Sequence, residues 1–327
     1  MVIRYGSKKS GGTKHIPHGY DWWLALKGNS KYYNYTLSIN GTARFFENQY
    51  LTDVMSDYAI DFLNQGFIKT SPFFMTLATP ACHAPFTPAD RHKVCYLNET
   101  VVRTPSFNAT PYNKHWLLQM KPTSLPENVE ILDEIQKNRL QTLLAVDDMV
   151  DRVVEKLKDL NVLDNTYIIF TSDNGYHIGQ FSQPWDKRQP YQTDIKVPFL
   201  ISGPKIKKKS LSSFPISSVD ILPTILDLAN VKTPEKLKID GKSFKEVLFE
   251  KIEKMFQRRV YIEYHGMGSG STVENQCAVK EKWADPEHLL DGRSQYYVAS
   301  VLNVPRSKVQ RATSVGDIFK RKKTPQN

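Results

Sequence analysis

The 327-residue sequence lacks any hydrophobic run that approaches the roughly 20 continuous apolar residues of a membrane-spanning helix, which excludes a helical membrane span. No apolar segment follows the first residues, Met1 to Gly6, so we expect no signal peptide within this chain. The three cysteines, Cys82, Cys95 and Cys277, form neither a disulfide framework nor a CxxC metal pair. The content of 40% hydrophobic and 24% charged residues is instead typical of a globular protein with a sizeable core.

Positive charge exceeds negative charge, because 44 Lys and Arg residues face 34 Asp and Glu residues and the net charge is +10. The excess is concentrated in Lys205, Lys207, Lys208 and Lys209 and in the run 320–323. These runs would suit an anionic partner, whereas a solvated loop and a frayed tail are the plainer interpretation. The sequence contains no RRM signature and no zinc-finger spacing, which argues against a nucleic-acid partner.

Glycan acceptor motifs of the form Asn-x-Ser/Thr occur at Asn34, Asn40, Asn98 and Asn108, among residues that are typical of loops. Each motif alone arises easily by chance, but their clustering favours the secretory pathway. Because no signal peptide is present, we expect the true N-terminus to lie outside this chain.

Hydrophobic periodicity predicts helices and short apolar strands in alternation along the chain. Continuous apolar strands separated by helices favour an α/β fold with a mostly parallel sheet flanked by helices. We place a boundary at Asp240–Gly241, which separates a larger part, 1–240, from a smaller C-terminal part, 241–327, with a basic tail that we expect to be disordered. The expected helices are 51–63, 129–160 and 219–228, and the expected strands are 73–78, 166–171, 197–201 and 260–264.

Chemistry-bearing residues follow two of the expected strands, at the strand ends where α/β folds place their sites. His83 follows the strand at 73–78, and Asp173 and Asn174 follow the strand at 166–171. Adjacent Asp and Asn oxygens suit Ca²⁺ or Mg²⁺, but an Asp-Asn-Gly sequence is also a common turn. A lone histidine in a loop can be a catalyst or a hydrogen-bonded structural residue, so the residues alone leave both alternatives open.

Longer strings resemble the sulfatase family. They begin with Thr-Ser-Asp-Asn-Gly-Tyr-His-Ile-Gly-Gln-Phe at 171–181 and continue with Asp-Lys-Arg at 186–188 and Asp-Ile-Lys-Val-Pro at 194–198. The resemblance extends upstream through 28–41, 114–116 and 139–148, and it is weak beyond about residue 265. It implies an alkaline-phosphatase/sulfatase-like α/β fold.

The resemblance also implies roles for individual residues. Asp173 and Asn174 would supply oxygen ligands to a Ca²⁺ ion that polarises the sulfate, His83 would help to protonate the leaving alcohol, and Lys187 would bind a sulfate oxygen. An imidazole suits proton transfer, and a fixed ammonium suits negative charge that develops on a sulfuryl group. Weaker candidates for substrate binding are His177, His115 and Arg188, for which local hydrogen bonding is an equal alternative. We interpret Asp147 and Asp148, which lie in the middle of an expected helix, as structural.

The family implies a sulfuric ester hydrolase that acts on 6-sulfated glucosamine of heparan or keratan sulfate during glycosaminoglycan degradation, in the lysosome or elsewhere on the secretory pathway. Two alternatives stay open: a non-catalytic remnant that binds sulfated glycans, and a protein similar to the heparan-sulfate 6-O-endosulfatases. An alkaline-phosphatase-like phosphohydrolase is less favoured, because the strings around Lys187 are those of sulfatases.

One departure from the family concerns activity. Sulfatases carry a Cys-x-Pro-Ser-Arg segment, whose cysteine becomes a formylglycine nucleophile, and an upstream Asp-Asp pair that completes the calcium site; this sequence contains neither. We therefore expect an N-terminally truncated sulfatase that shows no turnover as written and binds Ca²⁺ weakly. We also expect His83, Asp173, Asn174 and Lys187 to converge on one cleft, with Asp173 facing Lys187 or Arg188 when no metal is bound.

Overall fold

The structure is a computed structural model that describes residues 11–110, 112–113, 124–125, 129–187, 191–232, 238–250, 259–265 and 296–302. The chain divides into two compact units. The first unit contains residues 1–101 and 128–166, and the second contains 102–127 and 167–327. The boundary expected at Asp240–Gly241 stays a prediction.

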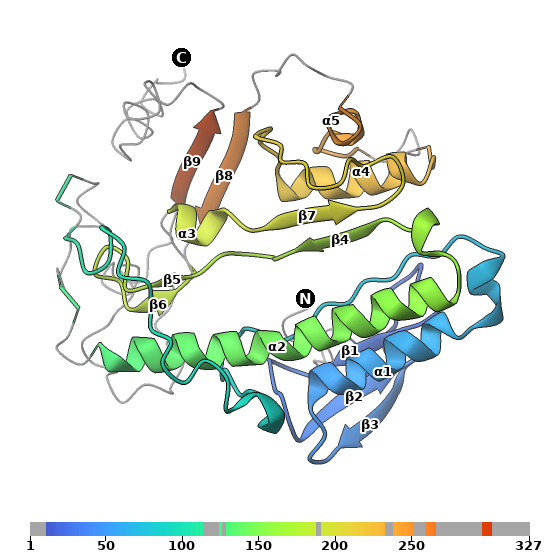
Figure 1. Ribbon diagram of the computed structural model, residues 1–327, viewed down its shortest axis with the longest axis horizontal. Helices are drawn as coiled ribbons and strands as arrows, with labels where there is room; N and C mark the ends of the chain where they lie inside the picture. The colour runs from blue at the N-terminus through green and yellow to red at the C-terminus, as the bar shows by residue number, and fades with distance from the viewer. Residues whose placement is uncertain are drawn as a thin grey trace. The chain divides into compact units, whose positions relative to one another are not determined.

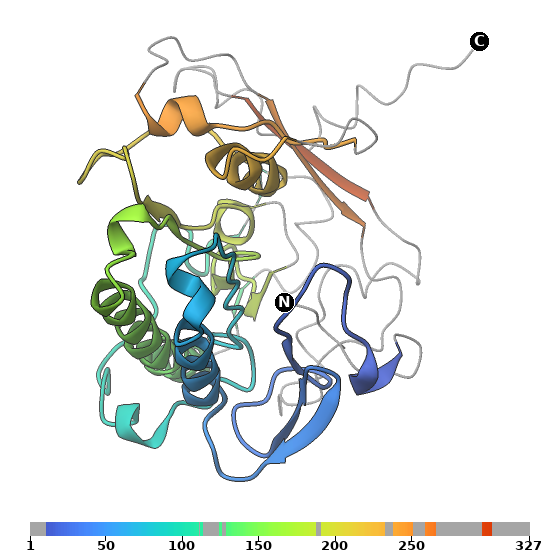
Figure 2. The same ribbon diagram turned by 90° about the vertical axis from the view of Figure 1, so that its right-hand side faces the viewer.

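In the first unit, one helix lies between an antiparallel sheet and a second, longer helix (Figure 1), an arrangement that Figure 2 shows nearly end-on. The predicted helices at 51–63 and 129–160 are confirmed as α1 and α2. The elements of this unit are η2 (Gly12–Lys14), β1 (Leu24–Leu26), β2 (Tyr35–Ile39), β3 (Thr42–Phe46), α1 (Leu51–Leu63), η3 (Gly66–Lys69), η4 (Asp90–His92), α2 (Glu130–Asp159) and η6 (Leu163–Asn165).

The hairpin of β2 and β3 corrects the expectation that residues around Asn34 and Asn40 form loops throughout. Asn40 and Gly41 both adopt positive φ, at 46° and 86°, as the two-residue turn between antiparallel strands requires. Asn34 precedes β2, so the residues between the two asparagines form a strand. Alternate residues of that strand, Tyr35 and Leu37, are 1% exposed and pack against α1.

The expected buried strand at 73–78 is not a strand of a sheet. Its side chains alternate between half-buried and exposed, as in extended backbone, but no described residue pairs with it in a ladder. A strand requires a neighbour for its backbone N–H and C=O groups. The apolar run predicted the extended conformation correctly and the pairing wrongly.

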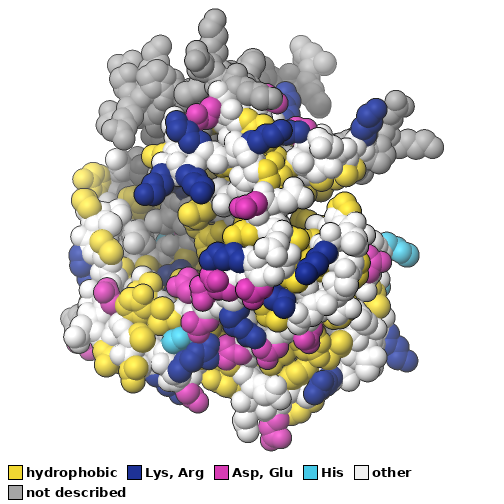
Figure 3. Space-filling view, turned by 45° about the vertical axis from the view of Figure 1, so that its right-hand side comes forward, with side chains coloured by type: hydrophobic (Ala, Val, Ile, Leu, Met, Phe, Trp, Pro, Cys, Tyr) yellow, Lys and Arg dark blue, Asp and Glu magenta, His cyan; other side chains and the backbone are white. Residues whose placement is uncertain are grey.

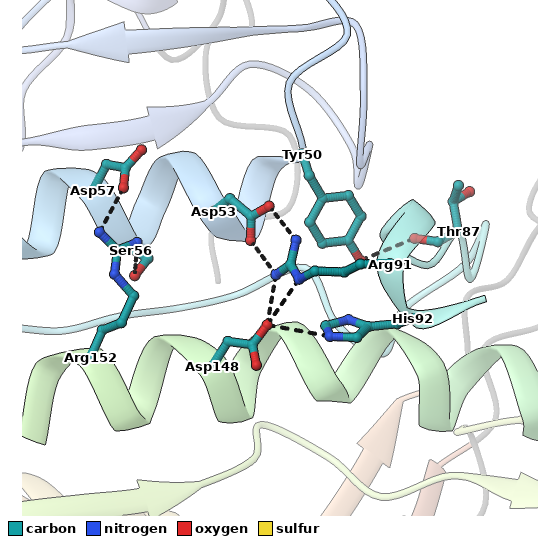
Figure 4. Close-up of polar contacts among 9 residues, drawn as sticks. All are labelled: Tyr50, Asp53, Ser56, Asp57, Thr87, Arg91, His92, Asp148 and Arg152. Atoms are coloured by element: carbon teal, nitrogen blue, oxygen red, sulfur yellow. Dashed lines mark hydrogen bonds and ion pairs between the residues drawn. The ribbon is translucent and has the colours of Figure 1, made fainter. Parts of the chain in front are cut away.

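Arg91 of η4 connects the two helices of the first unit (Figure 4). Its guanidinium donates to both carboxylate oxygens of Asp53 on α1, at 2.7 and 2.8 Å, and to Asp148 on α2, at 2.7 and 3.1 Å. The hydrogen bonds that Arg91 donates to Asp53, and then those to Asp148, raise the pKa of Arg91. The ring of His92 lies 3.3 Å from Asp148, so the structural interpretation of Asp148 is confirmed, while Asp147 is exposed.

The second unit contains short ladders, of which the β4–β7 pair lies next to the chemistry-bearing loop (Figure 1). The predicted strands at 166–171, 197–201 and 260–264 and the helix at 219–228 are present with slightly shifted ends. The elements are β4 (Ile168–Thr171), β5 (His177–Ile178), β6 (Trp185–Asp186), α3 (Gln192–Ile195), β7 (Phe199–Ser202), η7 (Ser218–Asp220), α4 (Ile221–Leu228), α5 (Lys245–Leu248), β8 (Arg259–His265) and β9 (Tyr296–Leu302).

The expectation of mostly parallel pairing is wrong for the described ladders, all of which are antiparallel. A parallel pair needs a crossover that carries the chain back to the start of the first strand. Here Thr171 at the end of β4 lies opposite Phe199 at the start of β7, so residues 172–198 leave and re-enter the ladder at the same end.

A buried carboxylate fixes the start of α4. Asp220 is 0% exposed and accepts hydrogen bonds from the backbone N–H groups of Ser217, at 2.7 Å, and Lys242, at 2.9 Å. Gly241 lies so close that a Cβ atom there would stand 1.8 Å from the carbonyl oxygen of Val219. Pro223 is tolerated because it lies in the first turn of α4, where no intrahelical donor is needed.

Large hydrophobic side chains remain exposed in both units, and Figure 3 shows such side chains interspersed with charged ones on the face that it draws. Among the described helices, none combines the length and the apolar character needed to cross a bilayer.

We predict that Arg91→Met lowers the free energy of unfolding by about 1–2 kcal/mol, because it removes two partly exposed ion pairs and leaves two carboxylates facing each other. Urea unfolding measures the loss, which should shrink in 1 M NaCl, where the Debye length is about 3 Å. Lys69→Met, at an exposed lysine, is the control and should change stability by less than about 0.5 kcal/mol. Equal losses in the two variants would contradict the prediction.

Candidate active site

The turn that carries His83 is held by a buried tyrosine from a distant part of the first unit. The hydroxyl of Tyr32 lies 2.7 Å from the carbonyl oxygen of His83 and 3.2 Å from that of Pro80. The turn also closes on itself, because the His83 amide donates to the Pro80 carbonyl at 2.8 Å. Burial, followed by Tyr50 and Cys82, raises the pKa of Tyr32, so its hydroxyl keeps the proton that it donates.

The imidazole of His83 has a defined tautomer. Its Nδ1 atom lies 2.8 Å from the carbonyl oxygen of Ala84, and a carbonyl oxygen can only accept a hydrogen bond. We therefore assign the proton to Nδ1. This assignment leaves Nε2, on the other side of the ring, as the atom that gains or loses a proton.

In the second unit, the loop that follows β4 is docked onto the backbone of α3. The amides of Gly175 and Tyr176 donate to the carbonyl oxygens of Asp194, at 2.8 Å, and Thr193, at 2.7 Å. A Cβ atom at residue 175 would stand 1.9 Å from the Thr193 oxygen, so only glycine permits this approach. The docking fixes the backbone that carries Asp173 and Asn174.

Asp173 and Asn174 are consecutive residues of this loop, and each carries a side-chain oxygen atom. The Asn174 amide nitrogen donates to the Gly175 carbonyl at 2.8 Å, which leaves its oxygen free to act as a ligand. Asp173 is exposed, and the Ser172 hydroxyl approaches its carboxylate only to 3.5 Å. The pair therefore suits a hard cation such as Ca²⁺, although the described residues contain no group of three or more His, Cys, Asp or Glu placed to hold a metal.

Lys187 directly follows β6, whose partner strand β5 begins with His177. His177 lies opposite Asp186 in this ladder, and the Lys187 amide donates to the Asp186 carboxylate at 2.8 Å. Among the described residues no ion pair joins Asp173 to Lys187, and the exposed Asp173 carboxylate can be solvated by water. Arg188, the alternative partner, lies outside the described residues, so the expectation that Asp173 faces one of these two cations stays a prediction.

A buried pair connects β5 to α3. The Nδ1 atom of His177 lies 2.9 and 3.1 Å from the two carboxylate oxygens of Asp194, and the two side chains are 5% and 1% exposed. The hydroxyl of Thr193 donates to the same carboxylate at 2.9 Å. Local hydrogen bonding, one of the two alternatives for His177, is therefore present, and a role in gripping the sugar stays a prediction.

The expected site residues fall into two groups. Asp173, Asn174, Lys187 and His177 belong to the second unit and His83 belongs to the first, so their convergence on one sulfate stays a prediction. His115 and Arg188 lie outside the described residues.

Two protein-family models match the part of the chain that carries the candidate site residues. The family model described as Sulfatase matches residues 5–231, a span that contains His83, Asp173, Asn174 and Lys187. A second model, described as N-sulphoglucosamine sulphohydrolase, C-terminal, matches residues 180–285. This chain belongs to the sulfatase family.

Curated relatives of this sulfatase have related names. It is 44% identical over 273 residues to the N-acetylglucosamine-6-sulfatases of Bos taurus and Homo sapiens, which covers 82% of this chain and 48% and 49% of theirs. It is 38% identical over 247 residues to a putative extracellular sulfatase Sulf-1 homolog of Caenorhabditis elegans, covering 73% of this chain and 35% of that protein. The chain thus spans about half the length of the first relatives.

Solved structures confirm the expected α/β fold class of this sulfatase. A protein in complex with its substrate D-glucosamine-2-N,6-O-disulfate has a TM-score of 0.65 and 25% identity, covering 78% of this chain and 64% of its own. A putative sulfatase yidJ from Bacteroides fragilis has a TM-score of 0.63 and 19% identity, covering 93% of this chain and 63% of its own.

Sequence reasoning missed two residues that hold the candidate site of this sulfatase together. Tyr32 precedes His83 by 51 positions and Asp194 follows His177 by 17, and neither spacing corresponds to a recognisable motif. Tyr32 and Asp194 lie within strings that carry the family resemblance, 28–41 and 194–198, but the resemblance assigned a role to neither residue.

We predict that Tyr32→Phe lowers the free energy of unfolding by about 1–2 kcal/mol, because one buried and one partly buried carbonyl oxygen lose their donor. Amide hydrogen exchange at His83 should become about tenfold faster, which separates opening of this turn from a general loss of stability. Tyr58→Phe, which removes a hydroxyl elsewhere in the first unit, is the control and should alter neither quantity. An unchanged rate of amide exchange at His83 in the Tyr32 variant would contradict the conclusion that the Tyr32 hydroxyl holds this turn.

We predict that replacement by alanine destabilises the protein strongly at one aspartate of the second unit and hardly at all at another. Asp194→Ala should lower the free energy of unfolding by about 2–3 kcal/mol, because it leaves the buried His177 imidazole without its partner. Asp173→Ala should change it by less than about 0.5 kcal/mol, because that carboxylate is exposed. Urea unfolding of both variants tests the contrast, and equal losses would refute it.

Proposed function

We propose that this chain is part of a sulfuric ester hydrolase that removes the 6-O-sulfate of N-acetylglucosamine in heparan or keratan sulfate. The observation that carries the proposal is the 44% identity to N-acetylglucosamine-6-sulfatases over 82% of the chain. The geometry around His83 and around Asp173 and Asn174 supports the reaction class, because it offers a proton donor in a fixed turn and two oxygen ligands on the loop that follows β4.

His83 would act as the general acid of the hydrolysis. The reaction breaks the bond between sulfur and the sugar O6 atom, and overall the oxygen of a water molecule bonds to sulfur. A protonated Nε2 would give its proton to O6 as that bond breaks, so that the sugar leaves as a neutral alcohol. The hydrogen bond from Nδ1 to Ala84 keeps the ring oriented throughout, and the proton lost from Nε2 is restored from water.

Lys187 would bind a non-bridging sulfate oxygen and offset the negative charge that develops on the sulfuryl group. Asp173 and Asn174 would hold a calcium ion, which when bound polarises the sulfate. These two residues supply two of the about six to eight oxygen ligands that calcium takes, so the remaining positions require other donors.

The secretory pathway, including the lysosome, is the compartment that this proposal requires for a glycosaminoglycan substrate. All four sequon asparagines are exposed, as a glycan requires. In three of them the carboxamide oxygen accepts a backbone N–H: Asn34 from Asn48, Asn40 from Trp23, and Asn108 from Leu125. These bonds use the carboxamide oxygens and do not involve the amide nitrogens, to which a glycan is attached.

The test measures binding, because none of the three cysteines lies in a Cys-x-Pro-Ser-Arg segment. Calorimetric titration in CaCl₂ compares N-acetylglucosamine 6-sulfate with unsulfated N-acetylglucosamine, and we expect at least a roughly tenfold preference for the sulfated sugar. Lys187→Met should weaken binding of the sulfated sugar about tenfold, whereas Lys196→Met, at an exposed lysine of the same unit, should not. Equal affinity for the two sugars would overturn the proposal.

The likeness to the Sulf-1 homolog of Caenorhabditis elegans makes an endosulfatase-like function the second candidate. Titration with a heparan sulfate oligosaccharide whose only 6-sulfate is internal distinguishes the two. The main proposal expects the terminal sulfated sugar to bind more tightly than this oligosaccharide, and the reverse order would favour the second candidate.

A further inference from the structure

The loop between β7 and η7, residues 203–217, carries a one-sided charge that the proposed site does not use. Four of its side chains, Lys205, Lys207, Lys208 and Lys209, are exposed, and the loop contains no acidic residue. We call residues 203–217 the lysine loop.

The lysine loop has a defined backbone. The amide of Ile206 donates to the Gly203 carbonyl at 3.2 Å, and the Ser210 hydroxyl donates to the Lys207 carbonyl at 2.9 Å. Lys205 and Lys209 both adopt left-handed backbone, with φ of 65° and 56°. A positive φ is energetically unfavourable for residues other than glycine. Such residues therefore adopt it mainly where the surrounding structure fixes the backbone. The turns therefore present the lysines in a preorganised arrangement, which reduces the entropy that a partner must remove on binding.

Most of the charge on the loop is not neutralised within the described part of the chain. Lys207 lies 3.3 Å from a carboxylate oxygen of Glu250. The other three lysines form no ion pair with a described carboxylate. Lysine ammonium groups act as compact point charges with three donors each, which suits separate sulfate groups along a polymer.

The lysine loop and the loop that carries Asp173 and Asn174 are attached to opposite ends of the β4–β7 ladder. Ser202 at the end of β7 lies opposite Ile168 at the start of β4, whereas Thr171, which leads into Asp173, lies opposite Phe199. The lysine loop thus leaves the ladder at the end opposite to Asp173, about 10 Å away along the strands. The ladder therefore separates the attachment of the lysine loop from the loop that carries Asp173 and Asn174.

We propose that the lysine loop is a second binding site, which holds a sulfated glycosaminoglycan chain at a distance from the site of hydrolysis. The choice of occupant rests on the proposed function. A site of this kind raises the local concentration of sulfated residues near the hydrolytic site without new contacts there. An anionic membrane is the weaker fit, because Leu211, which is 99% exposed, is the single fully exposed apolar side chain of the loop and stable anchoring needs a larger apolar contribution.

The test uses the 327-residue chain and a size-defined heparin dodecasaccharide, titrated at several NaCl concentrations. Replacing Lys205, Lys207, Lys208 and Lys209 by Gln should weaken binding at least about tenfold at 150 mM NaCl and flatten the salt dependence of log K by about 2–3, since that slope counts the ion contacts formed. The matched control replaces four exposed lysines elsewhere by Gln and should lose less than about threefold. Its positions are Lys14, Lys27, Lys69 and Lys196.

A charge-preserving variant and a membrane probe complete the test. Replacing the same four loop residues by Arg keeps the charge and should retain the affinity for heparin, which distinguishes lost charge from lost folding. Equal heparin affinity of the Gln variant and the wild type would overturn the proposal, as would binding of phosphatidylserine vesicles that depends on the loop while heparin binding does not.

Failure of this inference can be distinguished from failure of the proposed function. The loop Gln variant should bind N-acetylglucosamine 6-sulfate as the wild type does, and Lys187→Met should bind heparin within about twofold of the wild type. Loss of monosaccharide binding with loop-dependent heparin binding intact would count against the proposed function alone. Loop-independent heparin binding with monosaccharide binding intact would count against the lysine loop alone.

Discussion

The approach of Gly175 to the backbone of α3 is the contact on which the candidate site of the second unit depends. The amides of residues 175 and 176 donate to consecutive carbonyls of α3, and the missing Cβ is what allows the distance. The same helix supplies Asp194, whose carboxylate holds His177 at the start of β5. Since β6 pairs with β5, the position of Lys187 follows from the same contact. One glycine thus links the proposed calcium ligands to the proposed sulfate-binding lysine.

In each unit, a buried side chain holds a candidate site residue or its surroundings. Tyr32 is 2% exposed and fixes the turn of His83, and Asp194 is 4% exposed and fixes the region around His177. Asp173, in contrast, is exposed and forms no ion pair with Lys187. This separation suits the calcium role proposed for Asp173, because a carboxylate that is committed to a buried salt bridge cannot also bind a cation without cost.

The sequence predicted those elements whose stability depends on local patterns. The apolar stripes at 51–63 and 129–160 specify α1 and α2, since one face of each helix packs on a core. The β2–β3 hairpin also had a local signal, the Asn40–Gly41 pair, which the loop interpretation overlooked. Strand direction was predicted wrongly because it depends on where residues 172–198 re-enter the ladder. Tyr32 and Asp194 could not be predicted, because their roles arise only from contacts made in three dimensions.

The placement of charge follows from the same division between structural and accessible groups. Arg91 and Arg152 of the first unit are paired with carboxylates across the α1–α2 interface, and Lys245 of the second unit is paired with Asp227. Cations committed in this way contribute to folding and add little to the field outside the protein. The net charge of +10 must therefore be expressed by cations without such partners, and three of the described ones stand together on the lysine loop. Within the described part of the chain, a polyanion meets at that loop a cluster of positive charge that has few carboxylate partners, which is why we assign the loop a binding role separate from the chemistry proposed for His83 and Asp173.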